Sequence, residues 1–338
     1  MHDEWQSFLT QQSANVVDGL VNDFGNPQTE HLHANAENII TDLSNLNVLE
    51  VSGKDSGEFL HGQLSSDVAA LAEHEMQLSS WCNIKGRVIA SFLLYRSHDC
   101  FYLLLDKDLS DSVTKRLQMF VLRAEVSVSD RSDELIRIGI RGESLHKQVQ
   151  QILDTDPSEA AGILLRLQDT IPRSIILCSL DHAIYLWQQL SAQGNCVGTH
   201  HWARYNIEAG IAWVGKAGSE EFLPQSLNLD LLGGLSFEKG CYPGQEIIAR
   251  MHFRGKLKQR LFLSTVAVNE PAATGSKLYT VDVKQRIGMV VNASPASDQG
   301  CIMLVVLELA YADNVHIHLG AEDGPALELH ALPYSLDS

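Results

Sequence analysis

The sequence contains no closely spaced pair of cysteines. Its six cysteines are scattered over 338 residues and form no CxxC motif, which argues against a zinc ribbon or a self-contained iron–sulfur site. No apolar run approaches the roughly 18 residues that a membrane-spanning helix requires. The first residues, MHDEWQSFLTQQSANVVDG, lack a basic stretch followed by an apolar one, so we expect no secretory signal. These absences predict a cytoplasmic protein with free thiols and no membrane partner.

Basic residues are also scarce. The chain has 25 Lys+Arg against 42 Asp+Glu, a net charge of −17, and such a surface excludes a dedicated nucleic-acid binder. One exception is RMHFRGKLKQR, residues 250–260, which holds five basic residues and no acid. Taken alone, this run is most typical of a solvated connection between two elements. The alternatives are a site for a phosphate or an anionic tail, or a weak RNA contact.

Motifs of common cofactor and catalytic sites are missing as well. There is no GxGxxG, P-loop, HExxH or GxSxG sequence. Histidines occur as local pairs: His31 with His33, His200 with His201, and His316 with His318. Because a metal site usually needs three or four ligands and no third ligand is evident for any pair, we expect no bound metal.

Hydrophobic periodicity predicts an α+β chain with a β-rich end. Hydrophobic residues make up 45% of the sequence, enough for a sizeable core. Residues 1–36 are polar and weakly periodic, and predict a loosely ordered arm with one short helix. Strand-like runs such as VIASFLLY then alternate with helical spacing such as Asp111–Arg123, with Ser110 or Asp111 as its N-cap. After residue 256, short strand-like runs predict a small all-β barrel or sandwich.

The octapeptide KGCYPGQE, residues 239–246, contains a single cysteine between two glycines. Pro243 suits the first turn of a helix, which would put Cys241 just before a helix N-terminus. The helix dipole and Lys239 would then favour the thiolate. The alternative is a glycine-rich turn in which cysteine fills a small space. The local pattern leaves both interpretations open.

A second candidate lies in HHWARYNIEAGIAW, residues 200–213. The carboxylate of Glu208 is able to accept two parallel hydrogen bonds from a flat N–H edge such as that of a pterin ring. Trp202 is suited to stack on such a ring or to wall its pocket. Without further context, a solvated glutamate and a core tryptophan are the simpler interpretation.

The wider context makes these candidates specific. The octapeptide follows FLPQSLNLDLLGGLSFE and precedes IIARMHFRG, and four further pieces occur around it in order: GQLSSDV (62–68), CNIKGRV (82–88), WARYNIEAG (202–210) and LPYSL (332–336). Together they closely resemble the YgfZ family of folate-binding, tRNA-modification-related proteins, within the glycine-cleavage T-protein (aminomethyltransferase) superfamily. The resemblance covers nearly everything after residue 40, and the octapeptide is its most specific part.

The resemblance implies a particular α+β fold. It consists of two interleaved ferredoxin-like α/β subdomains plus a C-terminal small β-barrel, arranged around a folate site. The folate-binding body is then residues 37–255, with roughly 37–130 and 200–255 in one subdomain and 131–199 in the other. Residues 256–338 form the barrel.

The resemblance also implies a cofactor, which is tetrahydrofolate or a derivative. Cys241 matches the motif cysteine and is the expected reactive thiol. Glu208 matches the pterin-binding glutamate of the superfamily, and Trp202 matches a tryptophan associated with folate binding. The other expected cofactor contacts are Lys239, Tyr242, Gln245 and Arg254. Arg254 belongs to the basic run, which suits the polyglutamate tail of folate.

Two departures from the family pattern bear on the chemistry. T-protein enzymes carry an Asp-Asp pair that includes the catalytic aspartate, but Ala90 and Ser91 stand at the corresponding positions. Neither side chain is a carboxylate base, so ordinary aminomethyl transfer is not expected. Leu46 stands where a YgfZ protein can carry a second folate-associated tryptophan. Leucine keeps an apolar wall without the aromatic face, which predicts weaker or differently posed folate binding.

The expected function is that of a folate-binding accessory protein. It would support iron–sulfur enzymes, including those that thiolate tRNA, with Cys241 acting near the folate. Its implied partners are the folate and these enzymes, and any direct tRNA contact would be weak and salt-dependent. Two alternatives remain: a folate-dependent aminomethyl transferase in which Lys85, Arg87 or Glu208 replaces the missing aspartate, and a non-catalytic docking scaffold.

Overall fold

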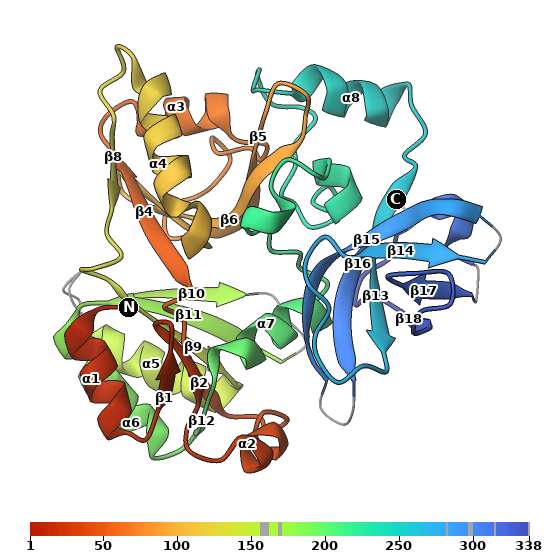
Figure 1. Ribbon diagram of the computed structural model, residues 1–338. Helices are drawn as coiled ribbons and strands as arrows, with labels where there is room; N and C mark the ends of the chain where they lie inside the picture. The colour runs from red at the N-terminus through yellow and green to blue at the C-terminus, as the bar shows by residue number, and fades with distance from the viewer. Residues whose placement is uncertain (156–161, 168–170, 282, 297–299, 314–315, 337–338) are drawn as a thin grey trace. The chain divides into compact units, whose positions relative to one another are not determined.

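The chain forms two compact units, each built from two separate stretches of sequence (Figure 1). The first unit is Met1–Leu49 with Asp130–Trp202, and the second is Glu50–Ser129 with Ala203–Ser338. The computed structural model describes residues 1–155, 162–167, 171–281, 283–296, 300–313 and 316–336. Within these ranges no helix has both the length and the apolar character needed to cross a bilayer.

The first unit is built on a five-stranded sheet with the strand order β10-β11-β9-β3-β12. Its strands are β3 (Ile39–Asp42), β9 (Ile136–Arg141), β10 (Ile163–Leu167), β11 (Arg173–Cys178) and β12 (Asn195–Val197). β12 pairs with β3 in parallel, and the other neighbours are antiparallel. Because β3 pairs with β9, residues 37–49 belong with this unit and not, as the sequence predicted, with the subdomain of residues 37–130 and 200–255.

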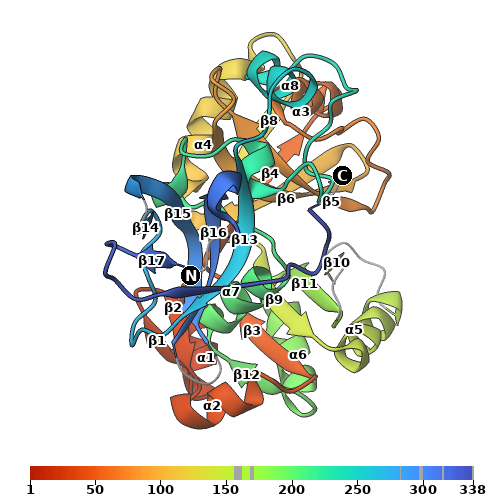
Figure 2. The same cartoon turned by 90° about the vertical axis from the view of Figure 1, so that its right-hand side faces the viewer.

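Three helices supply the other half of the first unit's core: α1 (Asp3–Gln11), α5 (Glu143–Thr155) and α6 (Leu180–Ser191). In Figures 1 and 2 they lie against the sheet near its strands β3 and β9. Their apolar faces meet alternate side chains of the strands in one cluster, which includes Trp5, Leu9, Ile40, Ile138, Ile140, Val149, Leu186 and Trp187. The sheet and helices therefore form the two layers of an α+β unit.

Residues 1–36 differ from the loosely ordered arm that the sequence predicts. They form α1, a hairpin of β1 (Asn15–Val17) and β2 (Leu20–Asp23), and helix α2 (Pro27–His33). The Trp5 side chain is fully buried, and its Nε1 donates a hydrogen bond of 2.7 Å to Asp42 Oδ1. The buried side chains of α1 complete the core of the first unit. They are too few to give a clear helical periodicity in the sequence, so the sequence did not predict this order.

The second unit begins with another five-stranded sheet, of order β5-β6-β7-β4-β8. Its strands are β4 (Leu46–Ser52), in which the division between the units falls, β5 (Met76–Cys82), β6 (Val88–Ser97), β7 (Cys100–Asp106) and β8 (Ser127–Asp130). Two helices accompany it, α3 (Ser56–Gln63) and α4 (Lys107–Val121). α4 begins earlier than predicted, because Asp106 rather than Ser110 or Asp111 is its N-cap and accepts a hydrogen bond of 2.9 Å from Asp108 N.

The predicted β-rich end is confirmed as a curled six-stranded sheet of order β17-β14-β15-β16-β13-β18. Its strands are β13 (Gln259–Val266), β14 (Lys277–Thr280), β15 (Val283–Pro295), β16 (Cys301–Glu308), β17 (Ile317–Leu319) and β18 (Leu327–His330). An isolated bridge between His318 and Ala326 brings its two edges together. This sheet belongs to the same compact unit as β5–β8, so it is not a separate body.

The segment between the two sheets of this unit carries most of the predicted motifs. It contains the end of α7 (Thr199–Glu208), two short 3₁₀ turns (Lys216–Gly218 and Pro224–Leu227) and α8 (Gln245–Phe253). One core cluster joins this segment to both sheets, including Cys82, Val88, Ile207, Leu227, Tyr242, Ile248, Leu261 and Val306.

Candidate functional site

Cys241 lies on an exposed loop before α8. The helix begins at Gln245, and Gly244 is its N-cap with φ of 82°, a backbone conformation that glycine adopts without strain. Pro243 therefore precedes the helix instead of occupying its first turn. Cys241 is four residues before the first helical residue, farther from the helix N-terminus than the sequence suggested.

The Cys241 loop packs on the turn of the CNIKGRV segment. A Cβ on Gly244 would lie 2.4 Å from Asn83 O and 2.6 Å from Gly86 Cα, distances too short for any side chain. The turn is held by the Asn83 side chain, whose Oδ1 accepts hydrogen bonds from Lys85 N (2.9 Å) and Arg87 N (3.0 Å). Two motif pieces that lie far apart in the sequence thus form one close backbone contact, which explains the glycines in both.

Lys239 is a buried anchor for the loop. Its side chain is only 8% exposed, and Nζ donates hydrogen bonds to the backbone oxygens of Leu64 (2.7 Å), Ser66 (2.9 Å) and His61. These three acceptors match the three donors of an ammonium group. Burial lowers the pKa of Lys239 to about 8, while nearby Asp67 acts in the opposite direction. Lys239 therefore ties the loop to the end of α3, and its donors are engaged away from Cys241.

The GQLSSDV segment is held to the same loop region by serine hydroxyls. Ser65 Oγ donates to Gly234 O (2.7 Å) and lies 2.8 Å from Ser80 Oγ. Ser236 N donates to Ser65 O (2.9 Å). The segment therefore links strand β5 to the residues that precede Lys239.

Two other predicted contacts of the octapeptide have structural partners. Tyr242 is buried in the core cluster, and burial raises its pKa. Its ring centroid lies 5.1 Å from Lys239 Nζ, a cation–π arrangement. Gln245 Nε2 donates a long hydrogen bond of 3.4 Å back to Lys239 O. Both side chains therefore stabilise the loop.

His61 is a neighbour of the loop that the sequence pattern did not indicate. A Cβ on Gly240 would stand 3.7 Å from His61 Nε2, and the other ring nitrogen, Nδ1, lies 3.3 Å from Asp67 Oδ1. Nδ1 accepts a hydrogen bond of 3.3 Å from Ala69 N, and the imidazole thus lies beside the residue that precedes Cys241. The only sequence signal was the position of His61 directly before GQLSSDV.

Glu208 ends α7 with its side chain 37% exposed. Its Oε1 accepts a hydrogen bond of 2.7 Å from Nε of the buried Arg204, one helical turn earlier. Oε2 has no hydrogen-bond partner among the residues that the structure describes. Arg204 therefore fixes the carboxylate and leaves one oxygen for a ligand.

Gly210, two residues after Glu208, brings the WARYNIEAG and LPYSL segments together. Tyr334 Oη donates to Gly210 O (2.8 Å) and accepts a longer hydrogen bond of 3.3 Å from Asn228 Nδ2. A Cβ on Gly210 would lie 2.7 Å from the Tyr334 ring, and φ of Gly210 is 69°. Through Tyr334, the LPYSL segment thus fixes the conformation of the turn that follows Glu208.

Trp202 and Leu46 belong to the first unit and are both buried, at 3% and 4% exposure. The Arg173 guanidinium carbon lies 4.9 Å from the Trp202 ring centroid. A Cβ on Gly139 would come within 2.8 Å of the same ring. The indole is therefore packed between protein groups and presents no open stacking face.

Ala90 and Ser91 are buried on β6. Ser91 Oγ accepts a hydrogen bond of 2.8 Å from Val214 N. These positions hold a methyl group and a hydroxyl engaged with the backbone, so they supply no acid–base group.

The basic run divides into a buried and an exposed part. Arg260 makes two hydrogen bonds to Asp230, of 2.6 and 2.9 Å, and is buried, so it is a structural residue. Four side chains are exposed at the end of α8 and after it: Arg250, Arg254, Lys256 and Lys258. Phe253 stands among them at 69% exposure. We call these five residues the α8 basic–aromatic patch.

An aromatic cluster supports this patch. The His252 ring stacks on Phe237 with centroids 3.8 Å apart, and Phe253 meets His252 edge-on at 4.7 Å. Phe253 is therefore held in place although it is exposed. The charges of the run are evident from the sequence, whereas the exposed position of Phe253 among them is evident only in the fold.

Comparison with known proteins supports the family resemblance. Residues 20–170 match the model of the GCVT N-terminal domain. The tRNA-modifying protein YgfZ of Klebsiella pneumoniae (strain 342) is 30% identical over 296 residues, which cover 85% of this chain and 90% of the relative. The tRNA-modifying protein YgfZ of Escherichia coli O7:K1 (strain IAI39) is 29% identical, with the same coverage.

A solved structure extends the comparison to the fold. The glycine cleavage system aminomethyltransferase T from Bartonella henselae superposes with a TM-score of 0.81 at 17% identity, covering 97% of this chain and 96% of that one. The α+β architecture is therefore that of the T-protein.

Proposed function

Because the chain belongs to the family of the tRNA-modifying protein YgfZ, we propose that it binds tetrahydrofolate or a derivative and supports tRNA modification. In this proposal it acts as an accessory to iron–sulfur enzymes that thiolate tRNA, in the cytoplasm, with the Cys241 thiol acting near the folate.

The observation that carries the folate proposal is the hydrogen bonding of the Glu208 carboxylate. Arg204 engages one carboxylate oxygen, while the other oxygen is open to a donor. A pterin offers adjacent N–H groups that suit such an acceptor. The open carboxylate oxygen is an acceptor that suits an N–H group of a folate ring, and Glu208 is the residue to which we assign its recognition.

The other predicted residues take supporting parts in this proposal. Trp202 and Leu46 are buried within the first unit, so we do not assign them to open stacking on the folate ring. Lys239, Tyr242 and Gln245 hold the Cys241 loop through the contacts described above. Cys241 is an exposed residue of this loop with a nucleophilic side chain, and it is the one we assign to chemistry.

The α8 basic–aromatic patch offers two uses. Its cations, Arg254 among them, suit either the polyglutamate tail of folate or the phosphates of tRNA. The exposed Phe253 favours RNA, because an aromatic ring can stack on a base and a polyglutamate tail has no ring to stack. We propose weak tRNA contact through this patch, with a steep salt dependence.

The transferase alternative is less well supported. General-base chemistry on the folate needs a titratable group at the right place, and Ala90 and Ser91 provide none. Lys85 and Arg87 belong to the turn that packs on Gly244.

Titration of the full-length protein with tetrahydrofolate tests the folate assignment. We expect saturable binding that Glu208→Gln weakens at least tenfold, because the amide replaces an ionised acceptor. Glu270→Gln, at an exposed site on another segment, is the matched control and should bind as the wild type does. Equal affinity of the two variants would remove Glu208 from the site.

Complementation tests the role of the thiol. In cells that lack the native protein, Cys241→Ala should fail to restore tRNA methylthiolation, whereas Cys100→Ala should restore it. Full restoration of tRNA methylthiolation by Cys241→Ala would contradict the proposed thiol chemistry. It would favour the alternative function of a non-catalytic docking scaffold.

A further inference from the structure

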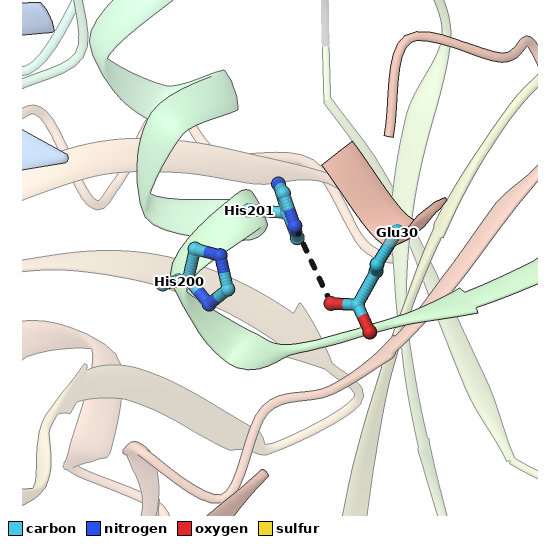
Figure 3. Close-up of side chains that lie close together, drawn as sticks. All are labelled: Glu30, His200 and His201. Carbon is cyan, nitrogen blue, oxygen red and sulfur yellow. Dashed lines mark ion pairs between the residues drawn. The ribbon is translucent and has the colours of Figure 1, made fainter. Parts of the chain in front are cut away.

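A cluster of possible metal ligands lies in the first unit, apart from the residues assigned to folate. Glu30 on α2 faces the neighbouring His200 and His201 at the start of α7 (Figure 3). One ligating atom of each side chain lies within 4.8 Å of those of the other two. The sequence presented His200 and His201 as a pair without a third ligand, and the fold supplies Glu30 from a distant part of the chain.

The spacing within the cluster suits a single ion. His201 Nε2 lies 3.3 Å from Glu30 Oε1. Two ligands of a tetrahedral zinc ion, with bonds of about 2.0–2.1 Å, stand about 3.4 Å apart, so this pair already has the required separation. The His200 ring centroid is 4.0 Å from that of His201, with 39° between the ring planes. A shift of about 1.4 Å or less brings the third ligand to tetrahedral spacing.

The carboxylate is already oriented by backbone donors. Gly198 N donates to Glu30 Oε1 (2.6 Å), and Phe24 N donates to Oε2 (2.9 Å). Such outer hydrogen bonds typically hold metal ligands in place. They leave lone pairs on both oxygens, since a carboxylate has about four acceptor sites.

A metal-free hydrogen bond between Glu30 and His201 is the simpler account of two of these residues. It does not explain why further imidazoles gather there. The ring of His200 packs against His201, and the ring of His31, one residue after Glu30, has its centroid 5.3 Å from that of His201. Two imidazoles beside one buried carboxylate, with a third ring nearby, are a typical setting for a transition-metal ion with nitrogen and oxygen ligands.

We propose that Glu30, His200 and His201 bind one divalent transition-metal ion of the zinc or cobalt class, with the fourth position taken by water. The ion would tie α2 to the connection between β12 and α7 and so stabilise the first unit. This site is independent of the folate proposal, because it uses none of the residues assigned there.

Cobalt titration of the full-length protein tests the site. After chelator treatment and desalting, the wild type should bind one equivalent of Co²⁺ with the visible absorption of a tetrahedral site, and Zn²⁺ should displace it. His200→Gln should weaken binding at least tenfold. His33→Gln, at an exposed position on the same helix as Glu30, should bind Co²⁺ as the wild type does.

Thermal unfolding separates metal binding from misfolding. Zn²⁺ should raise the Tm of the wild type and of His33→Gln, since a ligand that binds only the folded state stabilises it, and should leave that of His200→Gln unchanged. Far-UV circular dichroism checks that His200→Gln is folded, and Glu30→Gln serves as a second variant. Absence of saturable Co²⁺ binding by the wild type overturns the proposal without any variant, as does equal binding by both histidine variants.

Discussion

Lys239 Nζ lies 2.7 Å from the backbone oxygen of Leu64, and this hydrogen bond joins the loop of Cys241 to the residue after α3. The same ammonium group donates to the backbone oxygens of His61 and Ser66. One side chain thus satisfies three carbonyl groups near the end of a helix, where intrahelical donors are missing. The lysine of the octapeptide is therefore explained by the position of the loop.

Lys239→Met should destabilise the protein by about 1–3 kcal/mol, because buried carbonyl groups lose their donor while the apolar stem is kept. Urea unfolding measures the change. Lys256→Met is the matched control on an exposed site and should stay within about 0.5 kcal/mol of the wild type. If both variants unfold at the same urea concentration, the Lys239 contacts contribute nothing to stability.

The cysteines should differ sharply in reactivity. Burial raises the pKa values of Cys82, Cys178 and Cys196 to about 12, and thiols react as thiolates. Cys241 is exposed, so iodoacetamide at pH 8 should label it first in the folded protein, while those three thiols stay unlabelled. Peptide mass spectrometry over time checks the order. Early labelling of Cys82 or Cys178 would contradict the burial seen here.

Two arginines of the same basic run should behave in opposite ways. Arg260→Met removes a buried partner of Asp230, and breaking such a pair costs about 3–5 kcal/mol. Arg254→Met affects an exposed side chain, so stability should change by less than about 0.5 kcal/mol. Urea unfolding measures both. In contrast, tRNA binding at low salt should fall for Arg254→Met, and an unchanged affinity would remove Arg254 from the α8 basic–aromatic patch.

The fold should lose stability at high pH, partly through Tyr334. Burial raises the pKa of Tyr334 to about 12, above its value of about 10 in an unfolded chain. The protonated hydroxyl therefore stabilises the folded state fully below pH of about 10, and this contribution is lost as the pH rises toward 12.

Tyr334→Phe should accordingly cost about 1 kcal/mol at pH 7, through the lost hydrogen bonds, and should show a shallower loss of stability above pH 10. Chemical unfolding at a series of pH values measures the slope. Tyr185→Phe, at a half-exposed position in the other unit, should leave both quantities unchanged. A slope that is identical in Tyr334→Phe and the wild type would show that Tyr334 does not titrate with unfolding.

Part of the fold was predictable because it depends on local periodicity. The alternation of strands and helices and the β-rich end after residue 256 follow from side-chain spacing along short segments. The first 36 residues were not predictable in this way. Their order depends on Trp5 reaching Asp42 and the core of the first unit, and such contacts leave no local pattern.

The site divides in the same manner. The sequence by itself determined the specific octapeptide around Cys241, the candidate Glu208, and the lack of a carboxylate at Ala90 and Ser91, because these are matters of residue identity. Only the tertiary structure decided that Lys239 binds backbone carbonyls, that Trp202 is covered by Arg173, and that Glu30 joins His200 and His201. The physical reason is that a side chain's partners are set by packing between segments far apart in the chain, and residue identity alone does not specify them.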